Sequence, residues 1–126
     1  MTDSEANRRR LVEESRRALL EVNERFWSRS ILGSSFYAQL GAQGFDCARS
    51  LLVEAIPEGS NTYSGTVIKQ DRHIINFDVD LDLPHLSEWG DVTQSFLEKC
   101  RKLEAIEPWA DPVVALALFD ELRRRN

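Results

Sequence analysis

The sequence lacks the features that mark membrane proteins, secreted proteins and disulfide-rich proteins. No run approaches the roughly 18 apolar residues of a membrane-spanning helix, and the first residues contain no apolar segment of a signal peptide. Its two cysteines, Cys47 and Cys100, match neither a CxxC motif nor a zinc-ligand spacing. We therefore expect a cytoplasmic protein with free thiols and no membrane contact.

Recognised catalytic motifs are also missing. There is no GxSxG sequence, which excludes the nucleophile elbow of α/β-hydrolases. The glycines at 41 and 44 fit neither GxGxxG nor GxxxxGK, so neither phosphate-binding loop is present. The chain resembles no family by motif, and no cofactor is expected.

Positive charge is scarce in the middle of the chain. Residues 31–45 carry no charge, whereas residues 46–91 hold nine acids against Arg49, Lys69 and Arg72. The two ends are nearly neutral, so the formal net charge of −5 comes from this middle segment. Such a field repels nucleic acid and favours a basic protein partner. A chain of 126 residues fits one domain, spanning 1–126.

The residue pattern predicts a mixture of helices and strands. Apolar residues at helical spacing, with no Gly or Pro, predict a long helix over 4–30. Ser34 or Ser35 can begin a short helix that runs through Leu40 and ends at Gly41. Strands are expected at 62–69 and 73–82.

Residues 47–56 fit two interpretations. An apolar stripe at helical spacing follows Asp46, but Leu51, Leu52 and Val53 before Pro57 also suit a short buried strand. We predict a strand at 50–57, because a lone hairpin is only marginally stable in water.

Two helices are predicted at the C-terminal end. Asp91 is the expected N-cap of the first, with Gln94 reaching back as in a capping box, and Asp111 followed by Pro112 begins the second. The predicted fold is α+β: a long N-terminal helix, a three-stranded antiparallel sheet, and two C-terminal helices packed on its apolar face. The oligomeric state is left open.

The strand at 77–83 alternates strictly between apolar and acidic residues. Because side chains alternate across a strand, Phe77 and Val79 share one face, and Asp78, Asp80 and Asp82 form a row on the other. The apolar face is expected to contact the core. The acidic row is expected to be exposed to solvent, where such charges also discourage aggregation between sheet edges.

The first functional hypothesis is a non-enzymatic protein-binding module, of the kind found among immunity proteins, antitoxins and secretion chaperones. In this hypothesis the acidic sheet face binds a basic partner, and Trp89 is an anchor at the rim. The predicted partner-binding residues are Asp78, Asp80, Asp82, Glu88 and Trp89.

The alternative hypothesis is a divalent-metal-dependent hydrolase or nuclease-like enzyme. Its metal ligands would be Asp78, Asp80, Asp82 and His85, with Glu54 as a further candidate. The spacing of the aspartates is that of a calcium-binding EF-hand loop, but Leu83 and Trp89 stand where that loop needs Gly and Glu, which excludes it.

Overall fold

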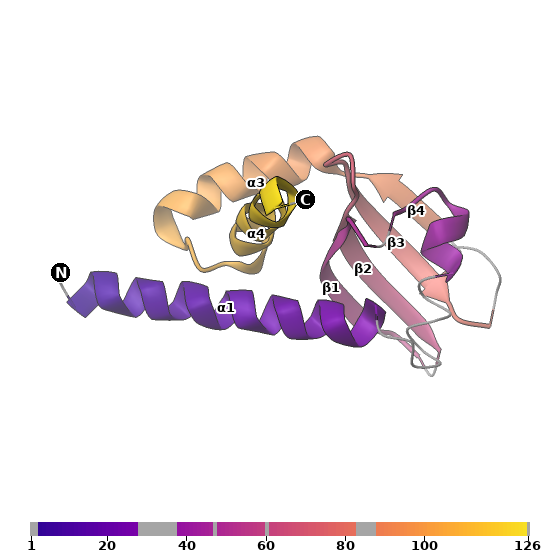
Figure 1. The fold of residues 1–126 in the computed structure, drawn as a ribbon, viewed down its shortest axis with the longest axis horizontal. Helices are drawn as coiled ribbons and strands as arrows, with labels where there is room; N and C mark the ends of the chain where they lie inside the picture. Colours follow the sequence, from indigo (N-terminus) through magenta and orange to yellow (C-terminus); the bar gives the residue numbers. More distant parts are fainter. Residues whose placement is uncertain (1–2, 28–37, 47, 60, 83–87, 126) are drawn as a thin grey trace.

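The structure, a computed structural model, describes residues 3–27, 38–46, 48–59, 61–82 and 88–125. The protein is α+β, with an N-terminal helix, an antiparallel sheet and C-terminal helices, as predicted (Figure 1). A short helical segment at 38–42 precedes the sheet. In chain order the other elements are α1 (Asp3–Trp27), β1 (Leu51–Pro57), β2 (Thr62–Ile68), β3 (Ile74–Asp80), β4 (Glu88–Asp91), α3 (Thr93–Ile106) and α4 (Asp111–Arg125).

The sheet has four strands in the order β1-β2-β3-β4, and every neighbouring pair is antiparallel. The predicted strand at 50–57 is confirmed as β1, but the prediction of three strands is wrong. The additional strand, β4, lies where the sequence indicated a loop leading into a helix cap. Four residues that include a glycine are too short to show a strand periodicity, and pairing with β3 is what makes this segment a strand.

Each face of the sheet contributes to its own hydrophobic core. On one face, Phe77 and Val79 pack with Leu40, Phe45 and Leu52. On the other face, one end of the sheet packs against the C-terminal helices, in a core formed by Leu19, Leu51, Val53, Ile68, Ile74, Val114, Ala115, Leu118 and Phe119.

The C-terminal helices therefore do not pack on the face of Phe77 and Val79, as the sequence predicted. They pack on the aspartate face, because its far end carries Ile68 and Ile74 rather than acids. The helical segment at 38–42 covers the opposite face, and it lies on the outer side of the sheet in Figure 1.

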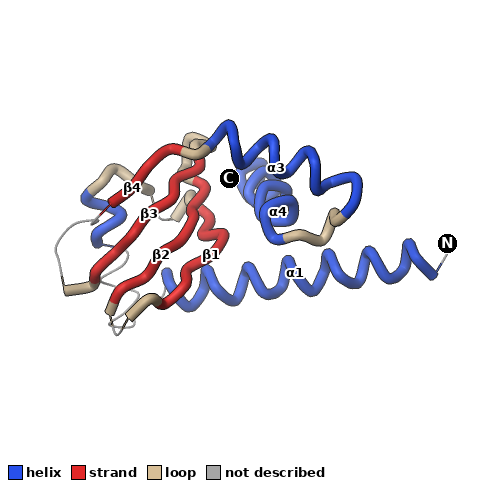
Figure 2. The backbone as a smooth tube through the Cα atoms, turned by 180° about the vertical axis from the view of Figure 1, so that it is seen from behind, coloured by secondary structure: helices blue, strands red, loops and turns tan. Residues whose placement is uncertain are grey.

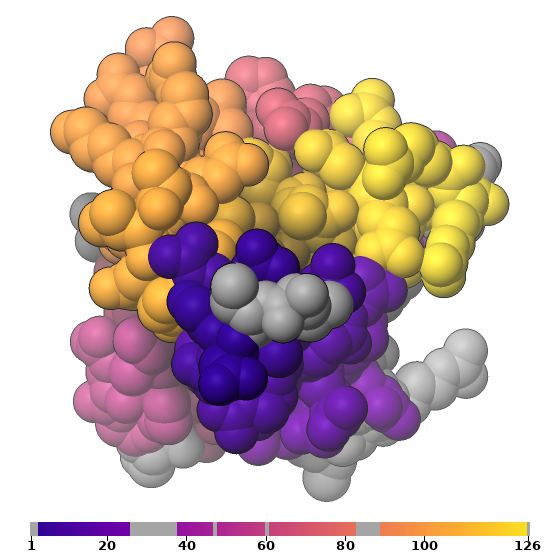
Figure 3. Space-filling view, turned by 90° about the vertical axis from the view of Figure 1, so that its left-hand side faces the viewer, coloured from indigo at the N-terminus to yellow at the C-terminus, as the bar shows by residue number. Residues whose placement is uncertain are grey.

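The three long helices, α1, α3 and α4, gather at one side of the sheet. Seen from behind, α1 runs alongside β1, and α3 and α4 lie above it (Figure 2). From the end of the molecule, α1 in indigo, α3 in orange and α4 in yellow form one continuous surface (Figure 3). Arg16 on α1 forms a bidentate ion pair with Glu121, and the hydroxyl of Ser15 donates to Asp111 at 2.8 Å, so both contacts join α1 to α4.

The helical segment at 38–42 is terminated by Gly44, and not by Gly41 as the sequence predicted. Gly44 has a φ of 85°, and its N–H donates to the Gly41 carbonyl while the Phe45 N–H donates to the Leu40 carbonyl. These two bonds form a Schellman motif, for which glycine is favoured because it has no Cβ to strain the left-handed backbone. The predicted capping residues Ser34 and Ser35 lie outside the described residues.

The helix predicted after Asp91 begins one residue later than expected. Its N-cap is Val92, with no side-chain cap, so the capping box with Gln94 is absent. The Asp91 carboxylate nevertheless accepts a hydrogen bond from the Thr93 N–H at 2.9 Å. Asp91 belongs to β4, and its pairing with β3 places it before the helix. α4 begins at Asp111, as predicted.

None of the described helices is long and apolar enough to cross a lipid bilayer. Cys100 on α3 is a free, buried thiol, and burial raises its pKa. Cys47 lies outside the described residues.

Candidate functional site

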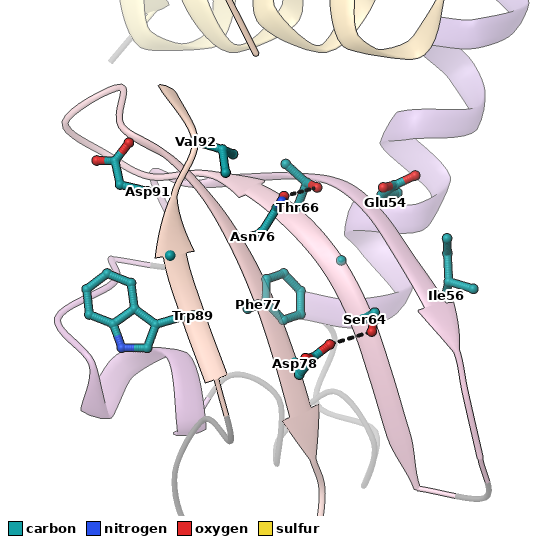
Figure 4. A pocket seen from close by; sticks show the side chains of 12 residues that line it. Glu54, Ile56, Ser64, Thr66, Asn76, Phe77, Asp78, Trp89, Asp91 and Val92 are labelled. Atoms are coloured by element: carbon teal, nitrogen blue, oxygen red, sulfur yellow. Dashed lines mark hydrogen bonds between the residues drawn. The ribbon is translucent and has the colours of Figure 1, made fainter. Parts of the chain in front are cut away.

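Half of the aspartate face is left open below the C-terminal helices. There the four strands form a shallow groove of about 500 Å³, called the sheet groove below (Figure 4). Its lining residues come from β1, β2, β3 and β4 and from the residue that follows β4. They are Glu54, Ile56, Ser64, Gly65, Thr66, Asn76, Phe77, Asp78, Trp89, Gly90, Asp91 and Val92.

A β-bulge in β1 places Glu54 on this face. Leu52 is opposite Val67, but the next pair is Glu54 with Thr66, so Val53 is an extra residue in the ladder. Without the bulge, alternation would direct Glu54 toward the core of Phe77. With it, Val53 joins the core under the helices while Glu54 remains exposed in the groove.

The floor of the sheet groove is polar and internally hydrogen-bonded. The Thr66 hydroxyl donates to the side-chain oxygen of Asn76 at 2.8 Å, and the Ser64 hydroxyl donates to the Asp78 carboxylate at 2.5 Å (Figure 4). Both pairs join residues directly opposite each other on β2 and β3. Cross-strand pairs of this kind hold the floor in one arrangement.

The groove has a single sign of charge. Three acidic residues, Glu54, Asp78 and Asp91, are among its lining residues, and no Lys, Arg or His is among those described. Asp91 is directly opposite Ile75, so its carboxylate points to the other face of the sheet. The Glu54 carboxylate is exposed and has no ion-pair partner within the described part of the chain. An uncompensated acidic groove of this kind attracts cationic side chains.

The carboxylate of Asp91 is held by hydrogen bonds from within the chain. Its carboxylate accepts hydrogen bonds from the Thr93 hydroxyl at 2.6 Å and the Thr93 N–H at 2.9 Å, and contacts His73 Nδ1 at 2.7 Å. These bonds, those from Thr93 first, lower the pKa of Asp91 to about 2. Asp91 is therefore ionised throughout the physiological range and is already engaged within the chain.

Two large apolar side chains stand at opposite ends of the sheet groove. Ile56 on β1 and Trp89 on β4 are each 51% exposed, and Figure 4 shows the indole at the outer edge of β4. Trp89 is directly opposite Phe77, so its side chain leaves β4 on the Phe77 side of the sheet, and it borders the groove at the outer edge of β4. Exposed aromatic side chains beside a groove are frequent anchors in protein interfaces.

Only two of the five predicted partner-binding residues, Asp78 and Trp89, line the groove. Asp80 lies beyond its lower end, where its carboxylate accepts a hydrogen bond from the Asp82 N–H at 2.9 Å. Asp82 follows the end of β3 and is bonded by the Asn61 amide. Glu88 pairs with Asp78 as a backbone neighbour, and its side chain lies outside the described part of the structure.

The sequence reasoning missed two acids of the groove as partner-binding residues. Glu54 was a candidate metal ligand and Asp91 the expected helix cap. The β-bulge in β1 and the fourth strand make these two acids lining residues of the groove, and neither feature has a clear signal in the sequence.

The metal-site hypothesis has no geometric support within the described residues. Among them no group of three or more His, Cys, Asp or Glu side chains is arranged to hold a metal ion. Asp78 is bonded to Ser64, whereas Asp82 is bonded to Asn61 past the end of the strand. His85 lies outside the described residues, so the four-residue site stays a prediction.

Comparisons of the chain with protein-family models, with curated proteins and with solved structures find no match. The sheet groove is thus described by its own geometry and charge alone.

Proposed function

We propose that the protein is a non-enzymatic binding module that docks a basic protein partner in the sheet groove. The observation that carries this proposal is the open groove lined by acidic residues, with the carboxylates of Glu54 and Asp78 on its face and no basic lining residue among those described. Charge of one sign across a concave surface increases the rate of association with an oppositely charged partner.

The residues of the groove would make different kinds of contact with the partner. Glu54 and the Asp78 oxygen that Ser64 does not occupy are the acceptors for Lys or Arg side chains of the partner. Ile56 and Trp89 provide apolar contact area at the two ends of the groove. Asp80 and Asp82 extend the acidic surface beyond the lower end, where they add to the long-range field.

Site-specific photocrosslinking tests the proposal. A photoreactive amino acid is introduced at Ile56, on the groove, or at Ile106, which is 64% exposed on α3 and serves as the matched control. We expect Ile56, but not Ile106, to crosslink in host cells to one defined protein with a basic surface. The purified pair should then bind more weakly as salt concentration rises.

Charge reversal identifies the residues that bind the partner. Glu54→Lys and Asp78→Lys should each weaken binding of that partner at least tenfold, because each puts like charge against its basic surface. Glu98→Lys, on the exposed surface of α3, is the control of equal charge change. Absence of a groove-specific crosslink, or equal loss in all three variants, would contradict the proposal.

A further inference from the structure

A second cavity lies on a different part of the molecule and does not share a residue with the sheet groove. It has a volume of about 340 Å³ and is bounded by the segment before β1, the β2–β3 turn and the last turns of α4. Its lining residues are Ala48, Arg49, Ser50, Leu51, Gln70, Phe119, Leu122 and Arg123. The volume is at the lower end of the range found for small-molecule sites.

The polar wall of this cavity is held by Gln70. Its side-chain oxygen accepts a hydrogen bond from the Asp46 N–H at 2.9 Å, and its amide nitrogen donates to the Gly44 carbonyl at 2.9 Å. The Ser50 hydroxyl donates to the Asp46 carbonyl at 2.8 Å. The segment before β1 is thereby tied to the hairpin, so this wall does not depend on a ligand for its shape.

The apolar wall belongs to the core beneath the helices. Leu51 and Phe119 are each only 3% exposed, and the half-buried Leu122 lies one helical turn after Phe119 on α4. Each of these side chains is fixed by its packing, so the cavity presents a preformed apolar surface next to its polar wall.

The charge of this cavity is opposite to that of the sheet groove. Two arginine residues, Arg49 and Arg123, line it, and no acidic residue is among its described lining residues. Arg49 has a single long contact of 3.6 Å with Asp46, and its side chain is 72% exposed. Arg123 has no ion-pair partner in the described part of the chain, although its place in the last turn of α4 also suits the helix dipole.

We infer that this cavity binds a small amphipathic anion. A carboxylate or phosphate group would be held between Arg49 and Arg123, whose planar guanidinium groups match either anion in a bidentate manner. The short apolar part of the same molecule would pack against Leu51, Phe119 and Leu122. This inference stands apart from the proposed function, because it uses a different surface and a ligand of opposite charge.

Titration of the protein labelled with ¹⁵N, followed by NMR, tests the inference with defined probes. Hexanoate and hexyl phosphate supply the two anionic groups on the same chain, hexan-1-ol supplies the chain without charge, and inorganic phosphate supplies the charge without the chain. We expect saturable shifts of the amides at 48–51 and 122–123 with at least one of the two amphipathic anions. The anion that binds more tightly identifies the head group that the cavity prefers. Hexan-1-ol and inorganic phosphate should each bind at least about tenfold more weakly.

Substitution of the arginines separates a specific site from general attraction to positive charge. Arg49→Gln and Arg123→Gln should each weaken binding of the tighter probe about tenfold, since each removes a charged hydrogen bond. Both side chains are at the surface, so both variants should fold. Arg124→Gln, an exposed position beside Arg123 that does not line the cavity, should bind as the unsubstituted protein does.

Three results would overturn the inference. One is the absence of saturable shifts with both amphipathic anions. Another is binding of hexan-1-ol or inorganic phosphate as tight as that of the amphipathic anions. The third is equal weakening by Arg124→Gln, which would show that the arginine cluster in the last turn of α4, rather than the cavity, attracts the probe.

Discussion

The side-chain amide of Asn23 on α1 pairs with the backbone of Leu52 on β1 in the way that a neighbouring strand would. Asn23 Nδ2 donates to the Leu52 carbonyl at 2.8 Å, and the Leu52 N–H donates to Asn23 Oδ1 at 2.6 Å. β1 is an edge strand, and Asn23 is only 7% exposed. One helical residue thus satisfies backbone groups that would otherwise be buried without partners, and it closes the edge of β1 to another strand at Leu52.

Removing this amide should destabilise the protein far more than a surface substitution on the same helix. Asn23→Ala leaves the buried N–H and C=O of Leu52 without partners, and each such group costs about 1–3 kcal/mol, so we expect a loss of about 2–4 kcal/mol. Urea unfolding measures it, with the exposed neighbour Glu24→Ala as the control. Equal losses in the two variants would show that the amide pairing contributes nothing to stability.

Two glycines of the sheet should respond differently to the same substitution. A Cβ at Gly65 would lie 2.3 Å from the Glu54 carbonyl oxygen and 2.8 Å from Cζ of Phe77, whereas a Cβ at Gly90 would have nothing within 4 Å. We expect Gly65→Ala to destabilise the protein by about 1–3 kcal/mol or more, because β1 or the Phe77 ring must move. Gly90→Ala should change the unfolding free energy by less than about 1 kcal/mol. A Gly65→Ala protein as stable as Gly90→Ala would contradict the close approach at this position.

The carboxylate of Asp91 should titrate well below an ordinary aspartate. Its pKa is lowered from 3.8 to about 2, so its interactions stabilise the fold above the unfolded pKa and are lost as pH falls through the folded pKa. NMR titration of the side-chain carboxyl carbon measures this value directly. The difference in melting temperature between the unsubstituted protein and Asp91→Asn should shrink between about pH 4 and pH 2.

The causes of that shift can be ranked by substitution. The hydrogen bond from the Thr93 hydroxyl contributes more than the hydrogen bond from His73. Thr93→Val removes that hydroxyl but keeps the backbone N–H, and it should raise the pKa of Asp91 further than His73→Gln. The Thr93 hydroxyl also accepts from the Ile74 N–H at 2.9 Å, so each variant needs a melting curve to show that it is folded. A larger rise with His73→Gln would reverse the ranking and make the His73 contact the main cause.

Arg72 combines an unfavourable backbone with a favourable ion pair. Its φ is 70°, in the left-handed region, and its guanidinium forms a bidentate pair with Asp120 on α4 at 3.0 and 3.1 Å. Arg72→Gly removes both the backbone strain and the ion pair. We therefore expect a small net change in the free energy of unfolding, within about 1 kcal/mol of zero. Asp120→Asn removes only the pair and should cost about 0.5–1 kcal/mol in the unsubstituted protein.

A double-mutant cycle isolates the pair from the backbone effect. If the pair is what fastens the β2–β3 turn to α4, Asp120→Asn should cost nothing once residue 72 is glycine. Denaturant unfolding of the four proteins measures the coupling. An unchanged cost of Asp120→Asn in the glycine background would mean that Asp120 acts through another contact.

Elements whose signals are local were predictable from the sequence. Apolar spacing without Gly or Pro predicted α1, alternation predicted β2 and β3, and Asp111 before Pro112 marked the start of α4. The same alternation correctly placed Phe77 and Val79 toward a core and Asp78 on the opposite face. These features can be predicted from the sequence because they depend on residues that are close together along the chain.

The tertiary structure alone decided which surfaces meet. β4 is a strand because β3 offers it a partner, and the bulge at Val53 turns Glu54 into the groove because the flanking residues of β1 and β2 pair around it. Likewise, Asn23 closes the edge of β1 only because α1 packs beside it. Each of these depends on contacts between residues far apart in sequence, which no local pattern records, and together they place the acids of the sheet groove.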